Sequence, residues 1–223
     1  HVPALFGSAD GWTVTFDFTI SDPAGGNPPA DGFAFSYGAI PSGTPSTLAE
    51  EGWPGIANVL SFEVDTWMVG DSEVGPAIAV DGSNVAFTNG DILGNGGSVT
   101  ATATISWDPT TGASFSTTGL TTNANFSKIA TPGFTGNNAY TFAFSARTGG
   151  ANEEVAIDNL IINTIGNPDS DGDGLPNDWE TANGLDPTHH RTRRATRPGA
   201  QAGPSGSLAD LDDAGISTIP SPL

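Results

Sequence analysis

Two acidic residues, Glu63 and Asp65, alternate with apolar residues in the segment 59–67. This alternation predicts a strand whose apolar side chains face a core, while Glu63, Asp65 and Trp67 share the other face. Two strand rises separate the carboxylates by ~6.6 Å, and at an effective dielectric of ~20 their repulsion is roughly 2–3 kcal/mol. A shared cation would turn that repulsion into attraction. The pair therefore indicates either a solvated strand face or a metal site, and both interpretations stay open.

A second acidic segment, residues 169–180, has the spacing of a calcium-binding loop. It fits the twelve-residue EF-hand template, with Gly174 at the sharp turn. A short helix over residues 177–182 is expected behind the loop, ended by Asn183-Gly184. The alternative is a solvated acidic linker. The predicted calcium ligands are Asp169, Asp171, Asp173, the Leu175 carbonyl, Asn177 and Glu180.

Short strands are the elements that must position these acids. The chain has 30 Gly, 17 Pro and 12 Phe, a composition typical of a turn-rich β protein. Residues before Gly166 show no convincing helical periodicity, and Asn89-Gly90 is a strong turn signal. We predict an all-β sandwich or jelly roll with strands at 12–20, 30–38, 59–67, 78–80, 84–88, 99–107, 113–118, 140–146 and 155–164.

Charge divides the chain into three segments. The formal net charge of −19 argues against nucleic acid and anionic membrane surfaces as partners. Residues 166–187 hold six acids and no Lys or Arg, whereas the segment from Thr188 holds four of the six basic residues, all Arg. We expect a sandwich domain over 1–165, a calcium repeat over 166–187 and a disordered tail over 188–223. Because the sequence starts at His1, its first residues are expected to be missing.

Residues 11–165 resemble the concanavalin A-like (legume-type or L-type) lectin domains of bacterial surface proteins. Four segments match this family in order: ADGFAFSYG, SFEVDTW, ATATISWDPTTG and YTFAFSARTGGANEEVAIDNLIINT. The resemblance implies an antiparallel concanavalin A-like sandwich. It also implies that the chain binds a carbohydrate rather than acting as an enzyme, and that copies of the chain could pair into a homodimer.

The resemblance places a sugar site around Asp31, which matches the family's sugar-binding aspartate and is expected to follow a cis peptide bond from Ala30. The loop 147–152 matches the wall of the same pocket. A plain turn at Asp31-Gly32 is the alternative. The expected carbohydrate-binding residues are Asp31, Gly32, Trp67, Arg147, Thr148, Gly149 and Gly150.

The resemblance also implies a metal site next to the sugar. Glu63 and Asp65 match its acidic pair, but Val69 stands where an asparagine is expected and Ala77 where a histidine is expected. Without imidazole, a transition metal is disfavoured relative to calcium. An all-oxygen calcium site would need Asp71 and Glu73 beside Glu63 and Asp65.

A glycoside hydrolase is a further alternative, because β-glucanases of the laminarinase type share this sandwich. Their strand motif, Glu-x-Asp-x-x-Glu, begins at Glu63 but has Met68 in place of the second glutamate. Retaining hydrolysis needs two carboxyls ~5 Å apart. The three His, at 1, 189 and 190, lie outside the sandwich. We therefore expect no enzyme activity.

The acidic loop is half an EF-hand, because a strand is expected before it. It resembles thrombospondin type 3 and dockerin-like repeats, which follow lectin domains in bacterial surface proteins. The leading hypothesis is a secreted or cell-surface module that binds a neutral glycan and calcium. The alternative is a structural or adhesive sandwich without sugar binding; Val69 and Ala77 favour it, whereas Asp31 and the loop at 147–152 favour binding.

Overall fold

A computed structural model gives the structure of the chain and describes residues 1–21, 29–41, 54–68, 74–93, 97–166, 170–171 and 177–189. Contacts between residues define one compact unit over His1–His190. The predicted boundary near residue 165 stays a prediction. The predicted tail from 188 lies outside the described residues from position 190 onward.

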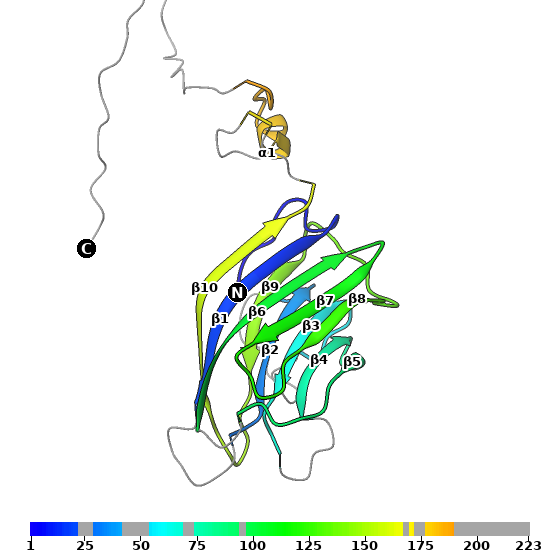
Figure 1. Ribbon diagram of the computed structural model, residues 1–223. Coiled ribbons are helices and arrows are strands. Elements are labelled where there is room, and N and C mark those ends of the chain that lie inside the picture. Colours follow the sequence, from blue (N-terminus) through cyan, green and yellow to red (C-terminus); the bar gives the residue numbers. More distant parts are fainter. Residues whose placement is uncertain are drawn as a thin grey trace, which may run out of the picture. The chain divides into compact units, whose positions relative to one another are not determined.

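Two five-stranded sheets form the sandwich, and all their paired strands are antiparallel (Figure 1). One sheet has the order β10 (Glu154–Thr164), β1 (Trp12–Ser21), β6 (Ser98–Asp108), β7 (Gly112–Thr118) and β8 (Asn125–Ile129). The other has the order β5 (Ser83–Phe87), β4 (Gly75–Val80), β3 (Val59–Asp65), β2 (Gly32–Gly38) and β9 (Thr141–Ala146).

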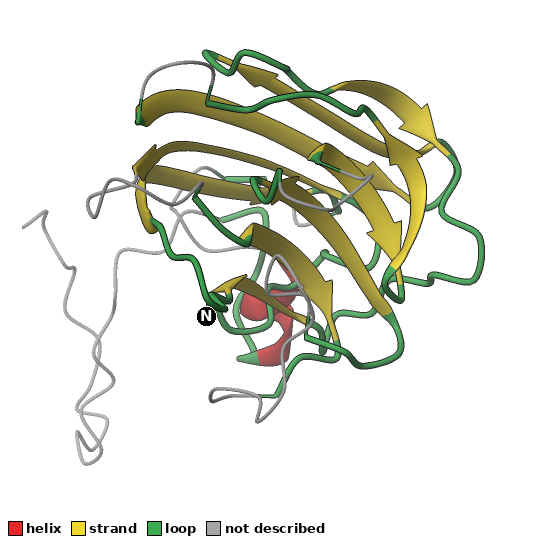
Figure 2. Ribbon diagram, turned by 90° about the horizontal axis from the view of Figure 1, so that it is seen from below, coloured by secondary structure: helices red, strands yellow, loops and turns green. Residues whose placement is uncertain are grey.

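The sheets stack as two layers with an aromatic core between them (Figure 2). In β1 every second residue is buried, as the alternation predicted. The fully buried ring of Trp12 makes edge-to-face contacts with Phe35, Phe62 and Phe142 of the opposite sheet, at centroid distances of 6.2, 5.8 and 5.4 Å. Such pairs add to the burial of their apolar area. The predicted all-β sandwich is confirmed.

β3 differs from its prediction in two respects. The strand ends at Asp65, so Trp67 lies beyond it and does not share its face. All seven residues of β3 are buried, including Glu63 and Asp65, so the interpretation of a solvated acidic face is wrong. β3 is an inner strand paired with β2 and β4 along its two edges, and the residues on both of its faces are buried. Alternation along one strand predicts that one face is buried, but it does not predict whether the other face is buried too.

The sequence pattern does not predict the strand β8. Its residues are mostly polar and mostly exposed, and it pairs only with β7 at the edge of the sheet. A register shift opposite Ala113–Phe115 and a positive φ of 54° at Lys128 interrupt its alternation. A short polar edge strand with a bulge has no regular pattern that a sequence reading could detect.

The predicted short helix is present as α1 (Asn177–Ala182). Gly184 adopts a positive φ of 71° behind it. The Gly184 N–H donates to the Thr181 carbonyl and the Leu185 N–H donates to the Glu180 carbonyl, which together form a Schellman cap. Among the described residues, no helix has the length and apolar character needed to span a membrane.

Candidate functional site

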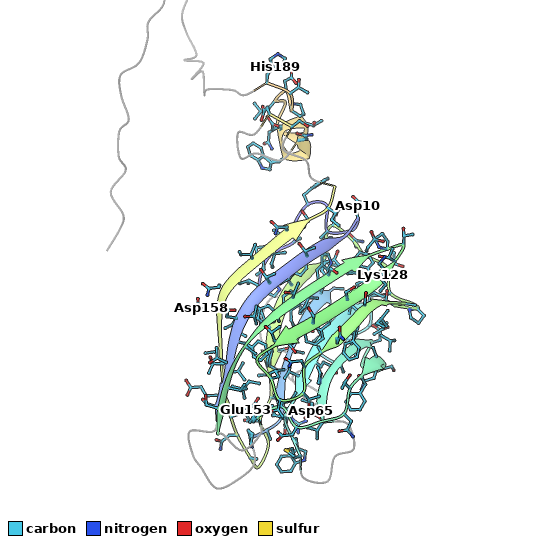
Figure 3. All side chains as sticks on the ribbon, in the orientation of Figure 1. Asp10, Asp65, Lys128, Glu153, Asp158 and His189 are labelled. Atoms are coloured by element: carbon cyan, nitrogen blue, oxygen red, sulfur yellow. The ribbon has the colours of Figure 1, made fainter. Side chains whose placement is uncertain are left out.

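Three segments meet at one end of the sandwich because their strands are antiparallel neighbours. Gly32 at the start of β2 is paired with Asp65 at the end of β3, and Phe33 is paired with Ala146 at the end of β9. The chain segments 29–31, 66–68 and 147–153 therefore lie together. Figure 3 shows Asp65 and Glu153 at this end, opposite the end that carries Asp10.

Asp31 lies at the centre of this end and is almost completely buried, with 7% exposure. The predicted cis peptide bond between Ala30 and Asp31 is present. The Asp31 N–H donates to the Arg147 carbonyl at 3.1 Å, and the Asp31 carbonyl accepts from the Thr66 N–H at 3.4 Å. Both flanking segments are thus bound to the backbone of Asp31.

Position 32, next to β3, requires a glycine because a side chain would not fit there. Its φ is 112°, and a Cβ there would lie 2.1 Å from the Val64 carbonyl oxygen. This close approach lets β2 start directly beside the end of β3. Gly32 therefore serves the site through its backbone.

The loop between β9 and β10 covers the Asp31 carboxylate. The Arg147 Nε lies 4.0 Å from Asp31 Oδ2, and the Arg147 side chain is about half exposed. A Cβ on Gly149 would lie 3.9 Å from the same oxygen, so the loop backbone passes close by. Thr148 and Gly150 flank it and are exposed. The structure therefore brings the predicted residues of this loop next to Asp31.

Trp67 approaches the site from the end of β3. The backbone N–H of Trp67 donates to Asp65 Oδ1 at 2.7 Å. The Asp65 carboxylate therefore binds the chain segment that follows β3. Trp67 is partly exposed, and the neighbouring Met68 is 51% exposed. This segment offers apolar surface beside the polar Asp31.

Glu153 also lies at this end of the sandwich, and no sequence pattern predicts it as a site residue. Its Oε2 accepts from Thr66 Oγ1 at 2.6 Å. Burial raises the pKa of Glu153 to about 6, with a smaller contribution from the negative charge of Asp31, while hydrogen bonds from Thr66 and the Gly32 N–H oppose the rise. Glu153 and Glu154 are adjacent in sequence, but Glu154 is exposed. A single sequence offers no signal that separates them.

The acidic pair of β3 does not form a complete metal site in the described residues. No group of three His, Cys, Asp or Glu side chains there could hold a metal ion. Ala77 of β4 is paired directly with Glu63, so a histidine at that position would face the acid, whereas alanine supplies no ligand. Val69, Asp71 and Glu73 lie outside the described residues.

The structure describes residues 170–171 and 177–180 of the acidic loop. Glu180, the expected bidentate ligand, lies on α1 with its side chain fully buried. The Asn177 amide is bound to Ser170: its Oδ1 accepts from the Ser170 N–H at 2.8 Å and its Nδ2 donates to Ser170 Oγ at 2.7 Å. Asp171 is half-buried, and Asp169, Asp173 and Leu175 lie outside the described residues. Carboxylate and amide oxygens are the donors that calcium prefers.

Comparison with solved structures identifies the fold as that of the legume lectins. The basic winged bean lectin with Tn-antigen matches with a TM-score of 0.55 and 19% identity, over 72% of this chain and 75% of that one. Lectin II from Ulex europaeus matches with a TM-score of 0.52 and 14% identity, over 74% and 78%. Metal-free lectin I-B4 from Griffonia simplicifolia matches with a TM-score of 0.51 and 19% identity, over 69% and 72%. No protein-family model and no curated protein matches the chain.

Proposed function

We propose that this chain is a non-enzymatic carbohydrate-binding module that takes a neutral glycan at Asp31. The observation that carries the proposal is the nearly buried Asp31 carboxylate under the loop with Arg147 and Gly149. A carboxylate accepts hydrogen bonds from sugar hydroxyls, and the partly exposed Trp67 can pack against the apolar face of a sugar ring. This combination of one polar anchor and apolar surface suits a sugar.

The charges around Asp31 favour a neutral ligand. Asp31 and Glu153 are acidic and Arg147 is the basic residue beside them. The whole chain carries a formal charge of −19. An anionic glycan would meet net repulsion, whereas a neutral one would not. The similar basic winged bean lectin is bound to Tn-antigen and the similar lectin UEA-II to galactose, so these sugars belong in the first set to be tested.

Calcium binding is proposed at the acidic loop 169–180. Asp169, Asp171, Asp173, Asn177 and Glu180 would supply side-chain oxygens, and Leu175 a carbonyl. A calcium repeat behind a lectin-like domain fits a secreted or cell-surface protein, where free calcium is plentiful. The support is the spacing of the acids and the buried position of Glu180.

A structural or adhesive module without sugar binding is the second candidate. The observation that favours it is Ala77, which faces Glu63 where the resemblance expects a metal-binding histidine. Without a metal at β3, the loops around Asp31 depend on their own hydrogen bonds. Sugar binding at these loops is then expected to be weak, which favours the second candidate.

A glycan array that includes neutral galactosides, probed with and without calcium, tests the proposed function. We expect retention of at least one neutral glycan by the wild-type chain and none by Asp31→Ala, because that variant loses the hydroxyl acceptor. Asp10→Ala, at the opposite end of the sandwich in Figure 3, is the control and should bind as the wild type does. Equal binding by Asp31→Ala would place the sugar elsewhere, and absence of any binding by the wild type would favour the structural module.

A further inference from the structure

The carboxylate of Glu153 connects segments that are far apart in the sequence. Its Oε2 accepts from Thr66 Oγ1, 87 positions earlier, at 2.6 Å. That distance is in the range of a charge-assisted O–H···O⁻ hydrogen bond. The Gly32 N–H also donates to this carboxylate. Glu153 therefore joins the end of β3 to the start of β2.

The same side chain closes the loop over Asp31. The loop leaves β9 at Arg147, whose carbonyl accepts from the Asp31 N–H. It enters β10 directly after Glu153. Both ends of the loop are thereby tied to the Asp31 region, one through its backbone and the other through the Glu153 carboxylate. Thr148 and the two glycines that follow lie between these ties.

We propose that Glu153 is the positioning residue of the sugar site, holding the loop 147–153 and the Thr66–Trp67 segment in place around Asp31. The inference rests on the proposed function for its effect on sugar binding. Its effect on the geometry of the segments is independent of any ligand. We expect Glu153 to act through its neighbours, because its Oε1 is enclosed by protein atoms and its Oε2 accepts from Thr66.

Burial explains why this position needs a hydrogen-bond acceptor. Thr66 is 2% exposed, and its hydroxyl would lose its acceptor if Glu153 were truncated. A buried hydroxyl without a partner is costly, which favours movement of Thr66 and the adjacent Trp67 toward water. Glutamine preserves an oxygen that accepts from Thr66, whereas alanine does not. The two substitutions therefore separate positioning from charge.

The experiment compares Glu153→Ala, Glu153→Gln and Thr66→Val with the exposed control Glu154→Ala in the full chain. Amide hydrogen exchange is followed in peptides covering 29–35, 64–68 and 147–153, and binding is measured on the array of neutral glycans. We expect Glu153→Ala and Thr66→Val each to accelerate exchange locally and weaken array binding by about tenfold, the effect of one lost buried hydrogen bond. Glu153→Gln should remain within about threefold of the wild type, and Glu154→Ala should change neither readout.

The two readouts distinguish failure of this inference from failure of the proposed function. Unchanged exchange in Glu153→Ala, or acceleration spread evenly over the sandwich, overturns the positioning role. Local acceleration without any glycan bound by the wild type supports the positioning role and counts against the sugar function. Wild-type binding that Glu153→Ala retains in full overturns the inference and leaves the sugar function standing.

Discussion

Asp31 and Glu153 are neighbouring acids with different surroundings. Asp31 has Arg147 beside its carboxylate and both of its backbone groups bound. Glu153 is held by Thr66 and Gly32 and has no cationic partner among the described contacts. Its raised pKa follows mainly from burial, which disfavours the charged form. The acid proposed to contact sugar and the acid proposed to hold the loops are therefore separate residues.

The raised pKa of Glu153 predicts a pH dependence of stability. Because the folded-state pKa of about 6 exceeds the ordinary value of 4.5, the folded chain binds this proton more tightly than the unfolded chain does. The free energy of unfolding should therefore fall as pH rises from about 4.5 to 6, and then level off. Glu153→Gln lacks this titration and should gain about 1–2 kcal/mol relative to the wild type between pH 4.5 and 7.5.

Urea denaturation of the wild type and of Glu153→Gln at several pH values measures this difference. Glu154→Gln is the matched control, because that carboxyl is exposed. A gap between the wild type and Glu153→Gln that stays constant from pH 4.5 to 7.5 would contradict the prediction.

At the scale of elements, the site depends on how closely β2 approaches β3. The two strands pair along their whole length, from Gly32 opposite Asp65 to Gly38 opposite Val59. Asp31 and Thr66 thus extend from two neighbouring inner strands of the sheet. Paired strands with an aromatic core behind them hold the ends of these loops at fixed separations.

Gly32→Ala tests this approach. The new Cβ would meet the Val64 carbonyl oxygen at 2.1 Å and would also force a side chain into a φ of 112°. We expect a loss of about 2–4 kcal/mol in the free energy of unfolding, from steric displacement of β2 added to backbone strain. Gly133→Ala isolates the strain, because Gly133 has a φ of 85° with nothing within 4 Å of its added Cβ.

Thermal and urea unfolding of both variants measure the two contributions. Gly133→Ala should lose about 1 kcal/mol, in keeping with the cost of a left-handed conformation. Equal losses in the two variants would mean that the close approach of β2 to β3 has no energetic role.

At the scale of the whole molecule, the chain combines a sandwich with an acidic segment behind it. The sandwich is stabilised by an extensive core, to which both sheets contribute aromatic rings. The acidic segment has a helix of six residues, too short to be stable without further support. Neutralisation of its carboxylates by calcium would supply that support.

Calcium is therefore expected to protect the segment 166–187 from proteolysis. Limited proteolysis of the full chain should slow there in millimolar calcium and recover after chelation. The expected apparent affinity is ~10⁻⁴–10⁻³ M, because a strand rather than a helix precedes the acidic loop. Glu180→Gln should abolish the protection, since it removes the bidentate carboxylate. Asp186→Asn, outside the twelve-residue loop, is the control. Cleavage at the same rate with and without calcium would identify the segment as an acidic linker.

Local patterns determined most of the strands, the sandwich and the spacing of the acidic loop. The alternation of Trp12–Ile20 and the Asn183-Gly184 helix stop are properties of adjacent residues, so they can be recognised in one sequence. The cis bond at Ala30–Asp31 and the loop over Asp31 followed from the lectin resemblance. Tertiary structure alone decided that Glu63 and Asp65 are buried, that Ala77 faces Glu63, and that Glu153 holds Thr66. These features depend on pairing between distant segments, and burial and hydrogen bonding across such pairs have no local periodicity by which a sequence could reveal them.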